Sequence, residues 1–283
     1  MQNVDRDGYG ITVNGIHSRP ILPEKVVDVG RFDVRINPEG SIEGGVLCTN
    51  VEATGTPFSV RGSLLALGSG TFVASPQGVG VIQGPVMVNE SLLMESSGGR
   101  RTSFRIVGDV SAKKVRLENV VIFGNLFGNN ISLKNCLIFG AVNATSQLRL
   151  DNSLCFTFLG NEVSIDNRVM LLNCSASANQ KLEIKGKVLS LAFNLWDRKQ
   201  PESGEIVELG SEDMKNVACE KENGSRESKI ILSCFDRIFD VTKLGKFAAE
   251  NINWVEDHLI RIVDDQSGEL AIEVEAVFHP LFD

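Results

Sequence analysis

Three consecutive stretches of the chain repeat one pattern: Ile106-Val-Gly-Asp-Val-Ser-Ala-Lys-Lys-Val-Arg-Leu-Glu-Asn119, Ile122-Phe-Gly-Asn-Leu-Phe-Gly-Asn-Asn-Ile-Ser-Leu-Lys-Asn135 and Ile138-Phe-Gly-Ala-Val-Asn-Ala-Thr-Ser-Gln-Leu-Arg-Leu-Asp-Asn152. Their first glycines, Gly108, Gly124 and Gly140, are 16 residues apart. Each stretch also closes on leucine, a charged residue and asparagine. A fixed period of this kind indicates a repeat architecture in which every copy is one structural unit.

The short period favours strands over helices. Helical repeats need two or more helices per copy and run to about 33 residues or longer. Within each copy apolar and polar residues alternate, as in Val115-Arg116-Leu117 and Ile131-Ser132-Leu133, which is the pattern of a half-buried strand. Glycine, asparagine and small residues separate these runs, where a corner requires a positive φ or leaves no room for a Cβ atom. The pattern therefore predicts a β-solenoid whose turns stack about 4.8 Å apart.

Looser copies of the repeat extend this coil in both directions. Gly62 and Gly84 stand in similar apolar contexts before the three regular copies, and Gly186 follows them. The polar segment that begins at Asp197 then interrupts the pattern. We therefore assign the β-helix to residues 32–194.

Two flanking regions differ from the coil. Residues 1–31 hold several glycines and prolines with only weak alternation, and they are interpreted as an N-terminal lead-in or cap. Residues 195–283 are predicted to form a small α+β appendage. It combines a strand candidate at 229–235, a helix at 241–258 and a hairpin at 259–278. The chain as a whole is thus expected to be mainly β.

The composition limits the classes of function. The net charge of −8 and the lack of a basic run with aromatic residues argue against nucleic acid as a partner. No segment reads as a signal peptide or as a membrane span, so a cytoplasmic location is expected. The six cysteines form no CxxC pair, and we expect neither a metal nor a cofactor.

One apolar set faces away from the predicted core. If Ile106, Ile122 and Ile138 point inward, then Val107, Phe123 and Phe139 stack on one outer face, with Phe127 nearby. These last four residues form a candidate interaction face. As its cover, we favour the chain's own C-terminal segment over an external partner.

The repeat, as written in Ile106-Val-Gly-Asp-Val-Ser-Ala-Lys-Lys-Val-Arg-Leu117, resembles that of the bactofilins, which are polymer-forming cytoskeletal proteins. The resemblance covers roughly residues 32–194. It implies a right-handed parallel β-helix that assembles end to end without nucleotide, with other copies of itself as partners and a second protein as a further candidate. The folded appendage leaves a capped coil, or a scaffold that does not polymerise, as an open alternative.

Enzyme functions find little support. A carbohydrate-active or carbohydrate-binding β-helix is the alternative hypothesis, but the acidic residues of the best copies occur singly and the coil lacks tyrosine and tryptophan. Left-handed β-helix enzymes need a strict six-residue period, which this chain lacks. The three histidines all lie outside the coil. The expected function is therefore a non-enzymatic β-helical scaffold that self-assembles or docks partners through its ends or an apolar side face.

Overall fold

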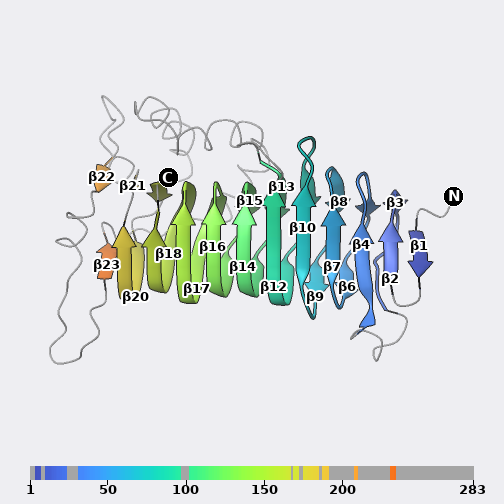
Figure 1. Cartoon of the computed structure of the whole chain (residues 1–283), viewed down its shortest axis with the longest axis horizontal. Coiled ribbons are helices and arrows are strands. Elements are labelled where there is room, and N and C mark those ends of the chain that lie inside the picture. Colours follow the sequence, from blue (N-terminus) through green and yellow to red (C-terminus); the bar gives the residue numbers. More distant parts are fainter. Residues whose placement is uncertain are drawn as a thin grey trace, which may run out of the picture. The chain divides into compact units, whose positions relative to one another are not determined.

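In the described part of the chain, the computed structural model consists almost entirely of β-strands (Figure 1). It describes residues 4–7, 10–23, 31–96, 102–166, 168–171, 175–184, 187–190, 207–209 and 230–233. These residues include no α-helix. The chain divides into two compact units, Met1–Ile131 and Ser132–Asp283, which are called unit 1 and unit 2.

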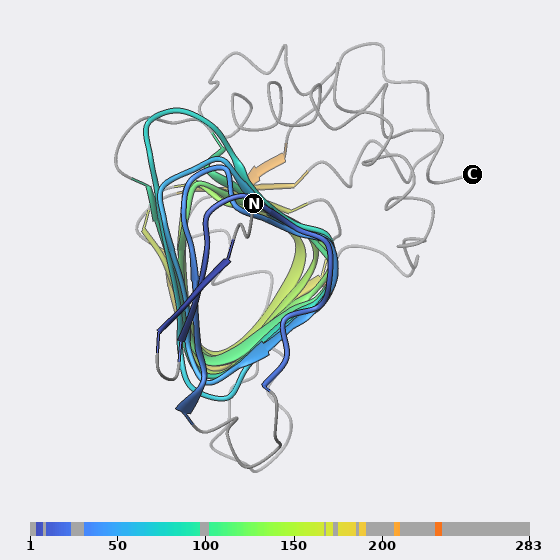
Figure 2. The ribbon, with the colours of Figure 1, turned by 90° about the vertical axis from the view of Figure 1, so that its right-hand side faces the viewer.

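Unit 1 is a right-handed parallel β-helix in which each turn crosses three faces (Figure 2). Face A contains β2 (Gly10–Val13), β4 (Asp33–Ile36), β7 (Val51–Thr54), β10 (Gly70–Ala74) and the C-terminal parts of β12 (Val86–Ser96) and β14 (Val110–Glu118). Face B contains β3 (Ile16–His17), β5 (Ser41–Ile42), β8 (Phe58–Val60), β11 (Gly80–Ile82), β13 (Phe104–Val107) and β15 (Val120–Phe123). Face C contains β6 (Val46–Cys48), β9 (Leu64–Ala66), the N-terminal parts of β12 and β14, and the start of β16 (Leu126–Lys134).

Unit 2 continues the same kind of parallel pairing within itself. Strand β17 (Leu137–Asp151) pairs with β18 (Ser153–Ile165), which pairs with both β19 (Arg168–Leu171) and β20 (Ser175–Ile184). Strand β19 then pairs with β21 (Lys187–Ser190). The β-helix predicted from the repeat is thus confirmed in both units.

Antiparallel strands occur only at the ends of the described parallel ladders. At the N-terminal end, β1 (Val4–Asp7) pairs with β2. At the C-terminal end, β22 (Val207–Leu209) pairs with β21, and β23 (Ile230–Ser233) pairs with β20. Strand β23 lies within the stretch predicted as a strand in the appendage, whereas the predicted helix at 241–258 and the hairpin at 259–278 fall outside the described residues.

Parallel pairing begins earlier in the chain than the repeat suggests. Strand β2 pairs in parallel with β4, and Ile21 forms a parallel bridge with Val46. Residues 10–21, which the sequence assigns to the lead-in, therefore supply a turn of the coil. The pattern is weak there because β2 is only four residues long and Gly15 and Pro20 interrupt the following corners.

The core follows the alternation of the strands. In β4, Val34 and Ile36 are fully buried while Asp33 and Arg35 are exposed. The isoleucines predicted to point inward, Ile106, Ile122 and Ile138, have no exposed surface. Burying such a side chain contributes about 1.5–3 kcal/mol. The inward residues of successive turns therefore supply the main stabilisation of each unit.

Three aromatic rings pack together in the core of unit 1. The ring centroids of Phe58 and Phe72 are 5.8 Å apart, and those of Phe72 and Phe104 are 6.4 Å apart. Gly80 lies between Phe58 and Phe104 in the parallel ladder. A Cβ atom on Gly80 would overlap the ring of Phe58. This glycine therefore leaves the space that the two neighbouring rings occupy.

A column of glycines sets the corner between faces B and C. A Cβ atom on Gly124 would lie 2.5 Å from the carbonyl oxygen of Gly108, and one on Gly108 would lie 2.7 Å from the carbonyl carbon of Gly84. The looser copies obey the same rule, since a Cβ atom on Gly84 would lie 2.5 Å from the carbonyl carbon of Gly62. Backbones approach so closely here that only hydrogen side chains fit.

The closing asparagine of each repeat forms another corner. Asn119 in unit 1, and Asn135 and Asn152 in unit 2, have φ values of 56°, 52° and 43°. This left-handed conformation costs most L-residues about 1–2 kcal/mol, but asparagine and glycine adopt it readily. The recurrence of asparagine after leucine and a charged residue thus records a positive φ at the same corner.

Replacing Gly124 with alanine is expected to reduce the free energy of unfolding by about 2–4 kcal/mol, because the new methyl group meets backbone atoms that have no freedom to move. Chemical denaturation monitored by far-UV circular dichroism measures this loss. Lys114→Ala, at an exposed position of the same turn, is the control and is expected to change stability by less than about 0.5 kcal/mol. An unchanged midpoint for Gly124→Ala would contradict the close approach.

At Asn152 two substitutions separate backbone from side-chain effects. Asn152→Ala is expected to unfold more easily than Asn152→Gly by about 1 kcal/mol, because both remove the amide group but only alanine resists the left-handed conformation. The measurement is the difference between the two denaturation midpoints. Equal midpoints would show that the corner does not require a positive φ.

Candidate docking surface

The structure exposes only two of the four residues predicted as an interaction face. Val107 pairs with Phe123 between β13 and β15, as the repeat register requires. Val107 and Phe127 are 42% and 41% exposed, but Phe123 is only 9% exposed and Phe139 only 1%. Only Val107 and Phe127 are therefore available on the surface.

The burial of Phe123 and Phe139 has a geometric basis. Successive residues of a strand point to opposite sides, yet all four residues of β15 are buried. The outer side of this strand is therefore covered as well as its inner side. In unit 2, Phe139 packs edge to face against Phe156, with ring centroids 6.4 Å apart.

A different apolar set is exposed on face C. The inward residues of this face, such as Val46, Leu64 and Val86, are at most 2% exposed, so the residues that follow them point outward. The outward position is occupied in successive turns by Leu22, Leu47, Leu65, Met87, Ser111 and Phe127. These six residues are called the apolar column.

Most members of the apolar column are well exposed. Leu22 is 55% exposed, Met87 52% and Leu65 36%, while Leu47 and Ser111 are half-buried. Leu67 lies beside the column and is 51% exposed. Sequence reasoning missed all of these residues except Phe127, although their register with Phe127 was the signal that could have found them.

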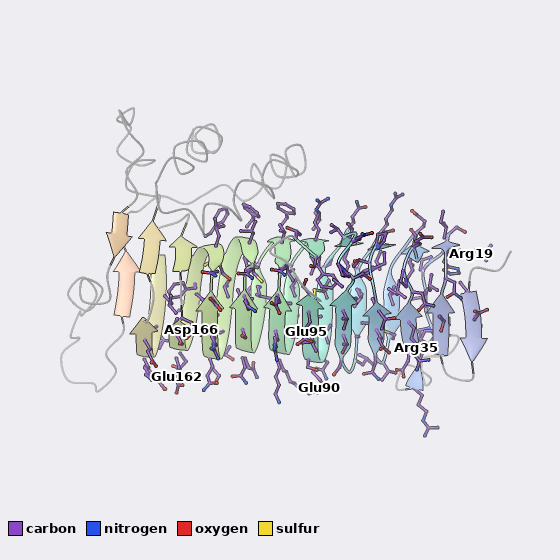
Figure 3. All side chains as sticks on the ribbon, turned by 45° about the horizontal axis from the view of Figure 1, so that its top comes forward. Arg19, Arg35, Glu90, Glu95, Glu162 and Asp166 are labelled. Carbon is purple, nitrogen blue, oxygen red and sulfur yellow. The ribbon has the colours of Figure 1, made fainter. Side chains whose placement is uncertain are left out.

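Face A carries charged residues at its outward positions. An ion pair joins Arg35 to Glu52 at 3.7 Å, and another joins Arg116 to Glu95 at 3.5 Å. Figure 3 shows Arg35 and Glu95 on the outside of the coil. Exposed pairs of this kind contribute roughly 0–1 kcal/mol each. Face A is therefore a solvated surface, in contrast to the apolar column of face C.

Unit 2 contains a shallow polar groove of about 290 Å³ over β17, β18 and β20. Its lining residues are Gln147, Leu148, Arg149, Glu162, Val163, Ser164, Asp166, Lys181 and Glu183. The three carboxylates make it the nearest match to the acidic groove that a carbohydrate-active β-helix would need. No aromatic residue lines it, so it offers no platform for stacking a sugar ring.

Each carboxylate of this groove already has a partner. Asp166 forms an ion pair with Arg149 and accepts a hydrogen bond from Ser164 at 3.3 Å. The side chain of Gln147 donates to Glu162 at 3.2 Å. Lys181 donates to Glu183 at 2.9 Å, and this hydrogen bond raises the pKa of Lys181. The groove thus holds its charges in pairs and is suited at most to binding a polar ligand.

Three cysteines are inert by position. Cys48, Cys136 and Cys155 are buried thiols outside any disulfide. Burial raises the pKa of Cys155 to about 12, and burial together with the negative charge of Asp33 raises that of Cys48 to about 12. Since the thiolate is the reactive form, neither thiol can serve as a nucleophile near neutral pH. Cys136 is likewise fully buried.

In the part of the chain that the structure describes, no three or more histidine, cysteine, aspartate or glutamate side chains group so as to hold a metal ion. Of the three histidines, His17 is half-buried in β3, and His258 and His279 fall outside the described residues. No helix among the described residues is long and apolar enough to cross a membrane.

We expect Cys48 and Cys155 to resist alkylation by iodoacetamide at pH 8 in the native protein, because both are buried and protonated. Peptide mass spectrometry after timed labelling measures each site separately. Protein unfolded in denaturant is the control, and there both thiols are expected to react at the rate of an ordinary cysteine. Rapid native labelling of either thiol would contradict the assignment.

Comparisons of the chain with protein-family models, with curated proteins and with solved structures found no match.

Proposed function

We propose that the chain is a non-enzymatic scaffold related to the bactofilins, whose β-helix docks protein partners along its side rather than stacking end to end. Residues 195–283 serve in this proposal as a cap or adaptor. The observation that carries it is the closure of the coil by antiparallel strands, combined with an exposed apolar side face.

The terminal strands support docking along the side, because in each unit an antiparallel strand already pairs with an outermost parallel strand. An uncapped β-helix exposes strand edges on which another copy can add. Here β1 covers the edge of β2 on face A of unit 1. In unit 2, β22 covers β21 and β23 covers β20. A copy that stacked end to end in these places would meet an antiparallel strand rather than the parallel ladder of the coil.

Within the described residues, the side chains favour a binding role over catalysis. The thiols of Cys48 and Cys155 are buried and protonated, and the carboxylates of the polar groove are paired with neighbouring bases or amides. A catalytic site needs a nucleophile or an acid–base pair positioned next to a substrate. The buried thiols also suit a reducing compartment, so the proposal places the protein in the cytoplasm.

A carbohydrate-binding β-helix is the second candidate, and the polar groove of unit 2 is the observation that favours it. Polar side chains at successive turns can bond to the hydroxyl groups of a sugar chain that runs along the coil. The missing aromatic platform makes this candidate the weaker one. Titration with neutral and acidic oligosaccharides, compared between the native protein and Glu162→Ala, distinguishes it from the scaffold.

The capped scaffold predicts that full-length protein forms no filaments. Negative-stain microscopy and light scattering measure this directly. Removal of residues 1–9, which contain β1, is expected to expose the edge of β2 and to promote end-to-end association. Removal of residues 1–3 alone leaves β1 in place and is the matched control.

The outcomes of this experiment are distinct. Filaments of the full-length protein would reject the capped scaffold and restore the polymer that the bactofilin resemblance implies. A variant without residues 1–9 that remains dispersed, with a native circular dichroism spectrum, would show that β1 is not what prevents association at this end.

A further inference from the structure

We propose that face C of unit 1 is a homodimer interface, in which the apolar column of one copy packs against the apolar column of a second copy. This inference rests on the scaffold proposal and names the partner that its side face would take. The observations that carry it are the exposure of the column, its register and its lack of charge.

The column is continuous from one turn to the next. Leu47, Leu65 and Met87 are direct partners in neighbouring parallel strands, and the bridge between Ile21 and Val46 brings Leu22 into the same line. Parallel strands lie about 4.8 Å apart, so the six positions span roughly 24 Å. A line of exposed aliphatic and aromatic groups of this length is more than scattered surface apolarity.

No outward position of the column carries a charge, in contrast to face A of the same turns. Face A presents Arg35, Glu52, Glu95 and Arg116. At the border of the column, an ion pair joins Lys113 to Glu90 at 2.7 Å. The part of a partner surface that meets the column must therefore be apolar and uncharged.

A second copy of face C meets these requirements. An interface about a two-fold axis uses the same patch on both copies, so an uncharged patch faces no repulsion from its own symmetry mate. Sheet faces pack about 10 Å apart, with side chains of the two inner sides interdigitating. Ser111, between Met87 and Phe127, is the smallest side chain of the column, so a larger side chain of the other copy would meet the least steric hindrance there.

A lipid surface fits the same face less well. Peripheral membrane binding relies on basic residues around an apolar surface, and the protein carries a net charge of −8. Of the basic residues near the column, Lys113 is already paired with Glu90. The observations therefore favour a protein surface.

The area of the apolar column sets the expected affinity of the dimer. Each face C strand, such as β6 or β9, has three residues, which gives a width of about 10 Å. The column then covers on the order of 250 Å² per copy, against about 800 Å² for a standard stable interface. The dimer is accordingly expected to be weak and dependent on concentration, with a Kd of about 10 µM or higher.

Sedimentation-velocity ultracentrifugation of the full chain over a wide concentration range tests the inference. The native protein is expected to shift from monomer to dimer as its concentration rises. Met87→Asp places a charge in the centre of the column and is expected to weaken the dimer at least tenfold. Leu65→Asp is a second variant with the same expectation.

Val73→Asp is the matched control, because Val73 is an exposed apolar residue on face A and the change adds the same charge. It is expected to leave the dimer intact. Circular dichroism and the Tm of all three variants establish that they fold, as substitutions at exposed positions normally allow.

Each other outcome overturns the inference in a distinguishable way. A native protein that stays monomeric at all concentrations removes the homodimer but leaves the capped scaffold standing. A dimer that Met87→Asp and Leu65→Asp leave unchanged assigns the interface elsewhere. Co-sedimentation of the monomer with neutral phosphatidylcholine vesicles, lost in Met87→Asp, would assign face C to lipid. Filaments would reject the scaffold proposal itself.

Discussion

The close approach of backbones at the corner between faces B and C is the constraint on which unit 1 depends. Because Gly84, Gly108 and Gly124 lack side chains, each turn can lie directly on the one before it. Turns held in this way keep one register, so inward residues meet inward residues and form a continuous core. A single bulkier residue in the column would disturb the stacking of two turns at once.

The same register turns local sequence into long surface features. Equivalent outward positions of successive turns line up in a column along the coil. The side chains of one column can all be apolar, or they can alternate in charge from turn to turn. On face A this produces ladders of opposite charges, as between Arg35 and Glu52. On face C it produces the apolar column from Leu22 to Phe127. A β-helix can therefore present a solvated side and a docking side without any additional element.

Antiparallel strands pair with the parallel strands at the ends of the described ladders. Parallel stacking has no natural stopping point, because every turn leaves an edge for another turn. Strands β1, β22 and β23 pair in the opposite direction and occupy such edges. With those edges occupied, the sides become the more suitable surfaces for association, and this links the fold to the proposed scaffold function.

The sequence by itself determined the coil, because its period, its glycines and its closing asparagines are each required by local geometry. The spacing of Gly108 and Gly124 and the recurrence of Asn119 and Asn152 identify corners whose φ values and contacts the structure then shows. Only the tertiary structure decided which outward residues are exposed. Alternation tells the side of a strand on which a residue lies, but not whether that side is covered, and Phe123 and Phe139, which were assigned to an outer face, are buried. Contacts between residues distant in sequence likewise determine how β1 and Ile21 pair and how exposed Leu65 and Met87 are. No local sequence pattern contains this information.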